Sequence, residues 1–407
     1  MREMPTLAYR CSRLAEMGAV NAKIDALLAE MVQAQDAAGV VAAAANDDGL
    51  SYLGAVGFQD REAGLAMGED SVFYIASMTK AVTSVAAMQC VERGLMELDE
   101  PIGGLLPYLA DPPVLEGYDQ AGAPIYRRAD KPITLRHLLT HTSGLAYTTW
   151  NHALFEFRQR LPNASPIEGP DLRRAAPLVH EPGTCWEYST STDFVGLAIE
   201  AAAGMTLAAY FEAYIFSPLG LTDTAYVPKA VSADRLAVRY RRSAGGGLER
   251  EPEEPTPVFF GGGGGLYSTA TDYLKFLAAL LRLQYVNDQD ALIGGATFDL
   301  MCEDQLSGEL AGQLPSAEPH RSNPMAFFPE ARPGWTLGFL LNRDPLPGRR
   351  AAGSLSWGGL YNSYYWLDPA TRITGVMFTQ VLPFADLRIL SRFDEFERYV
   401  YAGFEQR

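Results

Sequence analysis

Cysteine is scarce in this chain of 407 residues, and its spacing matches no common cysteine site. The four cysteines are Cys11, Cys90, Cys185 and Cys302, and no CxxC pair occurs among them. This distribution fits neither a zinc site nor a dense disulfide framework. We therefore expect free thiols, a reducing cytoplasmic location, and no metal or other cofactor.

Positive charge is also in short supply. The chain carries 33 lysine and arginine residues against 49 aspartate and glutamate residues, a formal net charge of -16 at pH 7. No basic stretch is longer than a pair such as Arg127-Arg128 or Arg349-Arg350. A negative field of this size repels polyphosphate, so nucleic acid is not an expected partner.

Long apolar runs are missing as well. The first ten residues lack the apolar stretch of a signal peptide, and Arg10 directly before Cys11 argues against a lipidation signal. The most apolar windows, such as residues 39–45, are far shorter than the ~20 residues of a membrane span. We expect a soluble protein without a membrane partner.

Several common catalytic motifs are absent. The sequence has no GxSxG elbow, no HExxH, no GxGxxG after a strand, no Walker A motif and no EF-hand loop. Five consecutive glycines, Gly261 to Gly265, are not followed by the Gly-Lys-Ser/Thr of a phosphate-binding loop. We interpret them as a site of tight backbone packing.

What the sequence does contain is material for a large core. Apolar residues make up 48% and aromatic residues 11% of the chain, and its length is about 2.7 times that of a typical domain. We predict a discontinuous α/β domain, residues 1–100 and 256–407, with a mainly helical domain, residues 101–255, inserted into it. The polar, breaker-rich segment 239–257 is predicted to be a solvated connection.

Periodicity assigns most elements of the α/β domain. Helices are predicted over residues 20–33, 77–93, 271–283 and 384–404. A hairpin is predicted from residues 39–45 and 51–56, and further strands from residues 335–341, 353–357, 361–367 and 373–380. Strands at both ends of the chain imply one discontinuous sheet. The helix over 77–93 is apolar all round, which is typical of a helix buried inside a domain.

The start of that buried helix carries the one S-x-x-K motif, Ser77-Met78-Thr79-Lys80. Residues i and i+3 share a helix face, so the Lys80 ammonium can lie beside the Ser77 hydroxyl. A lone lysine in an apolar helix needs a partner to offset its desolvation, unless its head group reaches solvent. Ser77 is thus a candidate nucleophile.

Two further segments add to this candidate site. Trp186 to Thr190, just before a predicted helix, offers the phenol of Tyr188 from the helical domain. Gly353 to Asn362 forms a predicted strand in which Gly358 and Gly359 leave room for a substrate against the strand edge.

In order and spacing, these motifs resemble the family VIII carboxylesterases, which share the fold of class C β-lactamases and penicillin-binding proteins. The resemblance runs from about Val40 to the C-terminus and includes residues 138–145 and 262–270. Residues 113–117 and 133–145 also resemble the fungal acyltransferases that load the side chain onto statins. The implied fold is α/β and β-lactamase-like, with an antiparallel sheet flanked by helices and an inserted mainly helical domain.

The resemblance implies a role for each motif residue. Ser77 is the nucleophile, and Tyr188, held partly as phenolate by the Lys80 ammonium, accepts its proton and returns it to the leaving alcohol. The backbone N–H groups of Ser77 and Leu360 form the oxyanion hole. His141 is interpreted as a hydrogen-bonded structural histidine.

Residues around this machinery are candidates for binding substrate. We predict that the small residues Gly358 and Gly359 line the site and that an acyl pocket is walled by aromatic side chains. The predicted aromatic residues are Tyr147, Trp150, Trp357, Tyr361 and Tyr364.

Two departures from the lactamase pattern bear on substrate. Tyr188-Ser189-Thr190 stands where lactamases have Tyr-x-Asn, and Trp357-Gly358-Gly359 stands where they have Lys-Thr-Gly. The site therefore lacks an amide and a cation that would bind a β-lactam. Arg349 and Arg350 are the local positive charges expected near the Trp357 strand.

We accordingly predict an enzyme that hydrolyses short to medium neutral acyl esters through an acyl-enzyme on Ser77. Acyl transfer from an ester or thioester to an alcohol is an alternative. A β-lactamase or D-amino-acid peptidase, and a non-catalytic binder with this fold, are further alternatives. The partner is a small-molecule ester, and the oligomeric state is left open.

Overall fold

The computed structural model describes residues 7–47, 49–162, 176–228, 234–252, 260–283 and 292–405, with side chains from residue 18 to residue 404 except that of residue 283. Its centre is an eight-stranded sheet in the order β12-β13-β14-β15-β16-β1-β2-β3, in which every neighbouring pair is antiparallel. The strands are β1 (Gly39–Asn46), β2 (Gly49–Asp60), β3 (Leu65–Ala66), β12 (Gly334–Trp335), β13 (Leu340–Leu341), β14 (Leu355–Gly359), β15 (Ser363–Asp368) and β16 (Ile373–Phe378).

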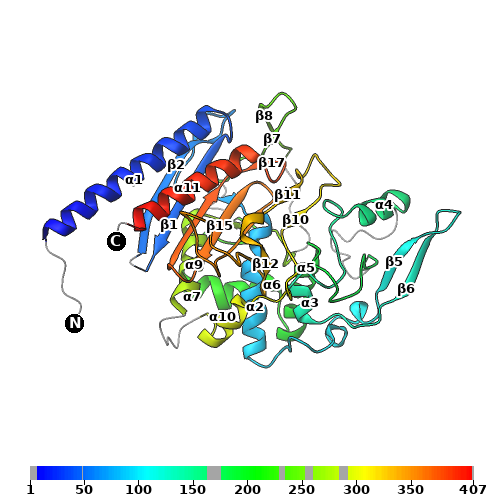
Figure 1. Ribbon diagram of the computed structural model, residues 1–407. Coiled ribbons are helices and arrows are strands. Elements are labelled where there is room, and N and C mark those ends of the chain that lie inside the picture. The colour runs from blue at the N-terminus through cyan, green and yellow to red at the C-terminus, as the bar shows by residue number, and fades with distance from the viewer. Residues whose placement is uncertain are drawn as a thin grey trace.

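Helices cover both faces of this sheet (Figure 1). Helices α1 (Leu7–Gln33) and α11 (Leu387–Glu405) lie side by side on one face, and α9 (Ala270–Leu283) packs against β1, β15 and β16. Strands β15 and β16 are buried along their whole length. The predicted α/β layers, with strands from both ends of the chain in one sheet, are confirmed.

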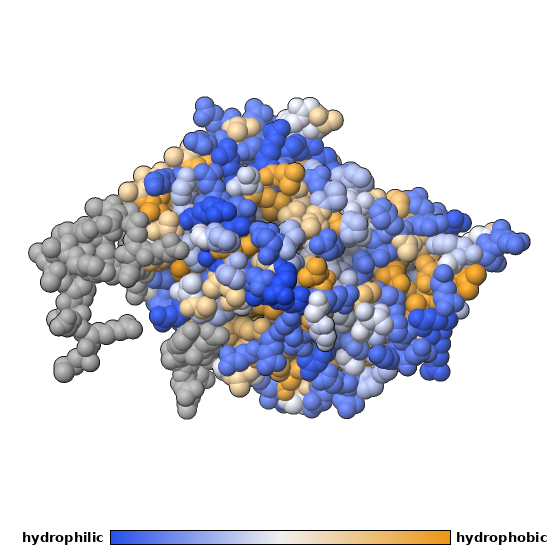
Figure 2. All heavy atoms as spheres, in the orientation of Figure 1, coloured by the Kyte–Doolittle hydropathy of each residue, from blue (hydrophilic) through white to orange (hydrophobic). Residues whose placement is uncertain are grey.

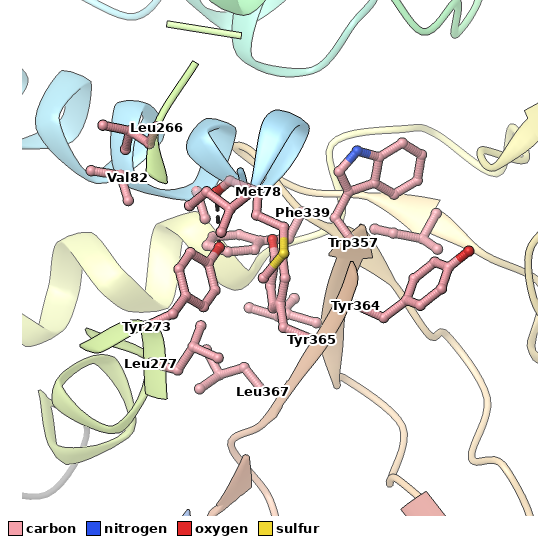
Figure 3. Close-up of a cluster of buried hydrophobic side chains, with 14 of the residues drawn as sticks. Met78, Val82, Leu266, Tyr273, Leu277, Phe339, Trp357, Tyr364, Tyr365 and Leu367 are labelled. Atoms are coloured by element: carbon pink, nitrogen blue, oxygen red, sulfur yellow. Dashed lines mark hydrogen bonds between the residues drawn. The ribbon is translucent and has the colours of Figure 1, made fainter. Parts of the chain in front are cut away.

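The pairing of β14 with β15 decides which side chains face the site. Trp357 pairs with Tyr365, so both lie on one face of the sheet, whereas Tyr364 and Trp366 lie on the other. Figure 3 shows Tyr365 beside Tyr273 of α9 and Tyr364 turned away from them. Trp366 packs on Phe393 of α11, with ring centroids 5.7 Å apart.

The helical part of the chain surrounds α2 (Thr79–Glu92), which packs against α5 and α6. A 3₁₀ turn, η1 (Ala76–Met78), leads into α2. The remaining helices are α3 (Leu135–Leu139), α4 (His152–Arg160), α5 (Ser191–Ala203), α6 (Leu207–Phe211), α7 (Ser217–Leu219) and α10 (Gly295–Cys302), with a π-helical turn η4 (Glu212–Phe216) and 3₁₀ turns η2 (Ile102–Gly104), η3 (Pro107–Leu109) and η5 (Pro329–Ala331).

Several short strands were not anticipated. Within the expected solvated connection, β7 (Tyr240–Arg242) and β8 (Leu248–Arg250) pair with each other, and β7 pairs in parallel with β17 (Val381–Leu382). Residues 239–252 are solvated as expected, since only Tyr240 and Leu248 are buried, but they form paired strands that the sequence did not predict. Residues 253–257 lie outside the described residues. The other small sheets are β4 (Phe73–Tyr74) with β9 (Tyr267–Ser268), β5 (Pro113–Tyr118) with β6 (Pro124–Arg128), and β10 (Gln313–Leu314) with β11 (Met325–Ala326).

The predicted strand over 335–341 is also corrected. It is a tight hairpin of β12 and β13, in which Gly338 adopts a positive φ of 117°. A side chain there would meet Ser84, since a Cβ built on Gly338 lies 2.2 Å from the Ser84 Oγ. Glycine thus reverses the chain against α2.

No single helix in the described part of the chain is long and apolar enough to cross a membrane. Segments Ser191–Ala203 and Leu207–Leu219 reach the required length only as a pair bent by 78°. Figure 2 shows hydrophilic residues over most of one face, with apolar patches scattered between them.

Candidate active site

Ser77 lies in the 3₁₀ turn that opens α2, on a backbone held from several sides. The preceding residue, Ala76, has a φ of 45°, a conformation that costs a non-glycine residue about 1–2 kcal/mol. The Thr79 hydroxyl donates to the Ala76 carbonyl at 2.7 Å. The Tyr273 hydroxyl donates to the Met78 carbonyl at 2.8 Å (Figure 3). These contacts hold the strained turn and leave the Ser77 side chain half-buried.

Lys80 lies one turn later and is only 1% exposed. Its Nζ donates to the Ser77 Oγ at 3.2 Å, to the Tyr147 hydroxyl at 3.2 Å and to the Gly263 carbonyl at 2.6 Å. An ammonium has three N–H donors, and each of them here has an acceptor. The site is therefore built to hold a charged lysine away from water beside Ser77.

The glycine run supplies one of those acceptors. Residues 262 and 263 pass so close to α5 that a Cβ on Gly262 would lie 2.3 Å from the Thr192 carbonyl oxygen, and one on Gly263 would lie 2.9 Å from the Asp193 carboxylate. The Gly263 N–H donates to Asp193 Oδ1 at 2.7 Å, while its carbonyl accepts from Lys80. The prediction that the glycine run is a site of tight backbone packing is confirmed.

Tyr188 approaches from the segment before α5 and is 2% exposed. The Lys80 Nζ lies 4.9 Å from the centroid of its ring. Its hydroxyl oxygen accepts a hydrogen bond of 3.0 Å from the indole N–H of Trp357. Tyr188 is therefore held between the Lys80 ammonium at its ring and the Trp357 indole at its oxygen.

The end of β14 lies against the turn that carries Ser77. A Cβ on Gly359 would lie 2.4 Å from the Ile75 carbonyl oxygen, so only glycine permits this approach. The N–H of the next residue, Leu360, donates to no acceptor among the described residues. Ser77 belongs to the first turn of a helical segment, where amides lack intrahelical acceptors. These two amides are the ones expected to bind an oxyanion.

Aromatic rings enclose this cluster. Tyr147, Trp150 and Tyr188 contact one another with centroid distances of 5.0–5.4 Å. Tyr361 packs on Tyr74 at 5.9 Å. Of the predicted pocket residues, Tyr147, Trp150 and Trp357 are thus brought to the Lys80 and Tyr188 side chains.

The structure does not place Tyr364 in the aromatic pocket that the sequence predicted for it. Its hydroxyl donates to Asn362 Oδ1 at 2.7 Å, and its ring packs on Phe393 of α11 at 5.2 Å. It belongs to the core on the other face of the sheet from Trp357. Gly358 lies over it, since a Cβ there would be 2.6 Å from the Tyr364 ring. The reason is the period of two along β15, which turns alternate side chains to opposite faces.

The two arginines expected near the Trp357 strand face α11 instead. Arg350 and Glu397 form an ion pair of 2.7 Å with both side chains 0% exposed. Arg349 pairs with Asp394 at 2.6 Å. Their charges are neutralised by acidic residues of the C-terminal helix.

His141 is fully buried beside the cluster. Its Nδ1 lies 2.9 Å from the Ser189 hydroxyl, and its ring lies 5.0 Å from that of Tyr188. Burial, together with the charge of Lys80, holds the pKa of His141 well below its usual value, so the ring is neutral. A hydrogen-bonded structural histidine was expected here.

Sequence reasoning missed one member of the cluster and one contact within it. Asp193 was not identified, although an acidic residue in the first turn of a helix, five positions after Tyr188, was available as a signal. The hydrogen bond of Tyr147 to Lys80 had no signal, because 67 positions separate the two residues. Within the described ranges, no group of three or more His, Cys, Asp or Glu residues has a geometry that suits a metal ion.

Comparison with known proteins gives the family of the chain. The beta-lactamase family model matches residues 24–395. The chain belongs to the beta-lactamase family. Its relatives include monacolin J acid methylbutanoyltransferase of Aspergillus terreus, 36% identical with 83% of each chain covered, and lovastatin esterase of Penicillium rubens, 32% identical with 81% of this chain and 86% of that protein covered.

A solved structure agrees with this assignment. Unliganded simvastatin synthase of Aspergillus terreus superposes with a TM-score of 0.82 at 30% identity, covering 95% of this chain and 99% of that one. The fold expected from the motifs is therefore confirmed, and the protein is an enzyme of the acyltransferase and esterase group with this fold.

Proposed function

We propose that this enzyme is an acyltransferase that forms an acyl-enzyme on Ser77 and passes the acyl group to an alcohol acceptor. The observation that carries the proposal is the contact of the Ser77 hydroxyl with a lysine whose three N–H donors are all bound. Burial of Lys80, Tyr188 and Trp357 to 4% exposure or less favours transfer over hydrolysis, because little water reaches these groups.

In the first step the Ser77 Oγ attacks the carbonyl carbon of an ester or thioester donor. The Ser77 proton passes to the Tyr188 oxygen, and the N–H groups of Ser77 and Leu360 bind the developing oxyanion. When the tetrahedral intermediate collapses, the bond to the leaving group breaks. Tyr188 then gives the proton to the departing alcohol or thiol.

The second step repeats the first with the acceptor. The acceptor hydroxyl gives its proton to Tyr188 while its oxygen attacks the acyl carbon. Collapse of this intermediate breaks the bond to the Ser77 Oγ, which recovers the proton from Tyr188. Lys80 remains charged throughout and stabilises Tyr188 as phenolate.

Ester hydrolysis is the second candidate, with water in place of the acceptor. The half-buried Ser77 side chain retains some access to solvent, and one relative carries the name lovastatin esterase. Both functions use the same acyl-enzyme, so they differ only in which nucleophile releases it.

A product-partition experiment separates the two. A thioester and an aryl ester donor of the same short acyl group are incubated with increasing concentrations of a small apolar alcohol, and both ester and free acid are quantified. Transfer predicts that ester product exceeds acid at millimolar alcohol, with Ser77→Ala giving neither. Acid as the dominant product across a series of alcohols would assign the enzyme to hydrolysis.

A further inference from the structure

A second phenol lies in the proposed site and takes no part in the steps described above. The hydroxyl of Tyr147 accepts a hydrogen bond from Lys80 at 3.2 Å, the same distance that separates Lys80 from Ser77. The Tyr188 hydroxyl is instead bound by the indole N–H of Trp357. Lys80 lies over both rings, 5.3 Å from the Tyr147 centroid and 4.9 Å from that of Tyr188, and it also donates to the Tyr147 oxygen.

The loop that carries Tyr147 is fixed in place by a second segment. The Thr149 hydroxyl donates to Glu318 Oε2 at 2.7 Å, and the Trp150 indole N–H donates to the Ser322 hydroxyl at 2.9 Å. The Thr149 carbonyl accepts from the N–H of residue 317 at 2.9 Å. These bonds hold the loop against residues 317–322.

The ring of Tyr147 also has its own packing. It lies 5.4 Å from Trp150 and 5.3 Å from Tyr188. A phenylalanine at this position would keep both contacts, so packing does not require the hydroxyl. The hydroxyl serves as the third acceptor of the Lys80 ammonium.

That role matters because the ammonium has almost no contact with solvent. Lys80 is 1% exposed, and its other two acceptors are the Gly263 carbonyl and the nucleophile itself. Without the Tyr147 oxygen, one N–H donor loses its acceptor, and the charged form of the lysine is destabilised. The ammonium is then also free to move away from the Tyr188 ring.

We propose, on the basis of the function proposed above, that Tyr147 is a positioning residue, which keeps Lys80 charged and fixed between Ser77 and Tyr188. Tyr147 acts on the reaction only through Lys80, whereas Tyr188 exchanges protons with Ser77 and the acceptor. Removing the Tyr147 hydroxyl should therefore slow catalysis and change its pH dependence, without removing the proton acceptor.

The test compares Tyr147→Phe with Tyr399→Phe, which removes a half-buried hydroxyl bound to Glu395 on α11. Fluorophosphonate labelling of Ser77 and the pH profile of kcat are measured for each, with thermal unfolding as the check on folding. Tyr147→Phe should lower kcat and the labelling rate about 10- to 100-fold, with KM changed by less than about threefold. The fall of kcat at alkaline pH, which follows from loss of the charged form of Lys80, should move to lower pH. Tyr399→Phe should match the parent.

The outcomes separate this inference from the function on which it rests. Failure of the parent itself to label at Ser77 would contradict the proposed function. If the parent labels and Tyr147→Phe keeps the parent's rate and pH profile, only the role of Tyr147 is wrong. A folded Tyr147→Leu variant, which also lacks the acceptor, should show the same pH shift and covers the case in which Tyr147→Phe does not fold.

Discussion

At the scale of single residues, the chemistry proposed for this enzyme depends on three side chains that share one proton pathway. Lys80 contacts the Ser77 hydroxyl directly and the Tyr188 ring through its charge. Groups that act together in this way lose activity as a unit, because removing one member leaves the others without a function.

Replacing any one of the three should therefore cost about as much as replacing all three. We expect Ser77→Ala, Lys80→Ala and Tyr188→Phe each to lower kcat on an activated aryl ester by about 10³ or more, with no further loss in the triple variant. Steady-state rates of the four variants test this. A Tyr188→Phe variant within tenfold of the parent would rule out Tyr188 as the proton acceptor.

Glu187, next to Tyr188, provides a test of stability. Burial raises the pKa of its carboxyl from 4.5 to about 7, against a smaller opposing effect of a hydrogen bond with Asn151. The folded state thus holds this proton more tightly than the unfolded chain between pH 4.5 and 7, so stability from this group falls as pH rises through that window.

Glu187→Gln removes this dependence. After allowance for the partial exposure of the side chain, we expect the variant to exceed the parent by ~2 kcal/mol in unfolding free energy at pH 8 and to match it near pH 4.5. Urea unfolding at the two pH values measures the difference. An equal effect of the substitution at both would mean that the carboxyl is not perturbed.

The residues of the proton pathway illustrate what the sequence alone can predict. Ser77 and Lys80 are three positions apart on one helix, so local geometry is enough to pair them. Tyr188 was identified only through the combination of motifs. The bonds of Tyr147 to Lys80 and of Trp357 to Tyr188 join segments 67 and 169 positions apart, and no local rule predicts such contacts.

At the scale of elements, the glycine run between α2 and α5 connects the start of α5 to Lys80. The N–H of Gly263 donates to the Asp193 carboxylate at the start of α5, and the Gly263 carbonyl accepts a hydrogen bond from Lys80. The position of α5 is thereby coupled to that of the ammonium through one residue.

Gly263→Ala should break this coupling. The added Cβ would lie 2.9 Å from the Asp193 carboxylate oxygens, so the carboxylate or the segment must shift and their hydrogen bond is disturbed. We expect kcat to fall by about 10-fold or more with a modest loss of stability. The matched control is Gly264→Ala, whose Cβ would have no neighbour closer than 3.8 Å and which should change kcat less than threefold. Equal kcat values for the two variants would contradict the coupling.

Periodicity predicted the long elements better than the short ones. The β1–β2 hairpin, α9 and α11 follow the expected ranges closely because each is long enough for its apolar residues to show a clear period. Strands β7, β8, β12 and β13 have two or three residues each, too few to show a period. They form because tertiary partners, such as β17 for β7, are available.

At the scale of the whole molecule, the net charge of -16 disfavours anionic substrates, and the two arginines expected near the Trp357 strand face another element. Arg349 and Arg350 are bound to acidic residues of α11. The Thr190 hydroxyl, where lactamases have an amide, has no hydrogen-bond partner among the described residues. A carboxylate entering the site would lose hydration without gaining a fixed partner.

We therefore expect kcat/KM for a neutral short-chain aryl ester to exceed that for benzylpenicillin by about 10³ or more, since at least two contacts to the β-lactam are missing and each 1.4 kcal/mol is tenfold. Parallel steady-state assays with both substrates provide the ratio. A comparable kcat/KM for the two would show that the site binds a carboxylate after all.

The acyl-enzyme itself can be observed directly. The protein is mixed with excess short-chain thioester, quenched in acid within seconds and measured by intact mass and peptide mass spectrometry, with and without an alcohol acceptor. The proposed function predicts a mass increase of one acyl group, located on the peptide that contains Ser77 and absent in Ser77→Ala, which disappears faster with alcohol than in water alone. No covalent adduct, or an adduct whose lifetime is unaffected by alcohol, would contradict transfer through Ser77.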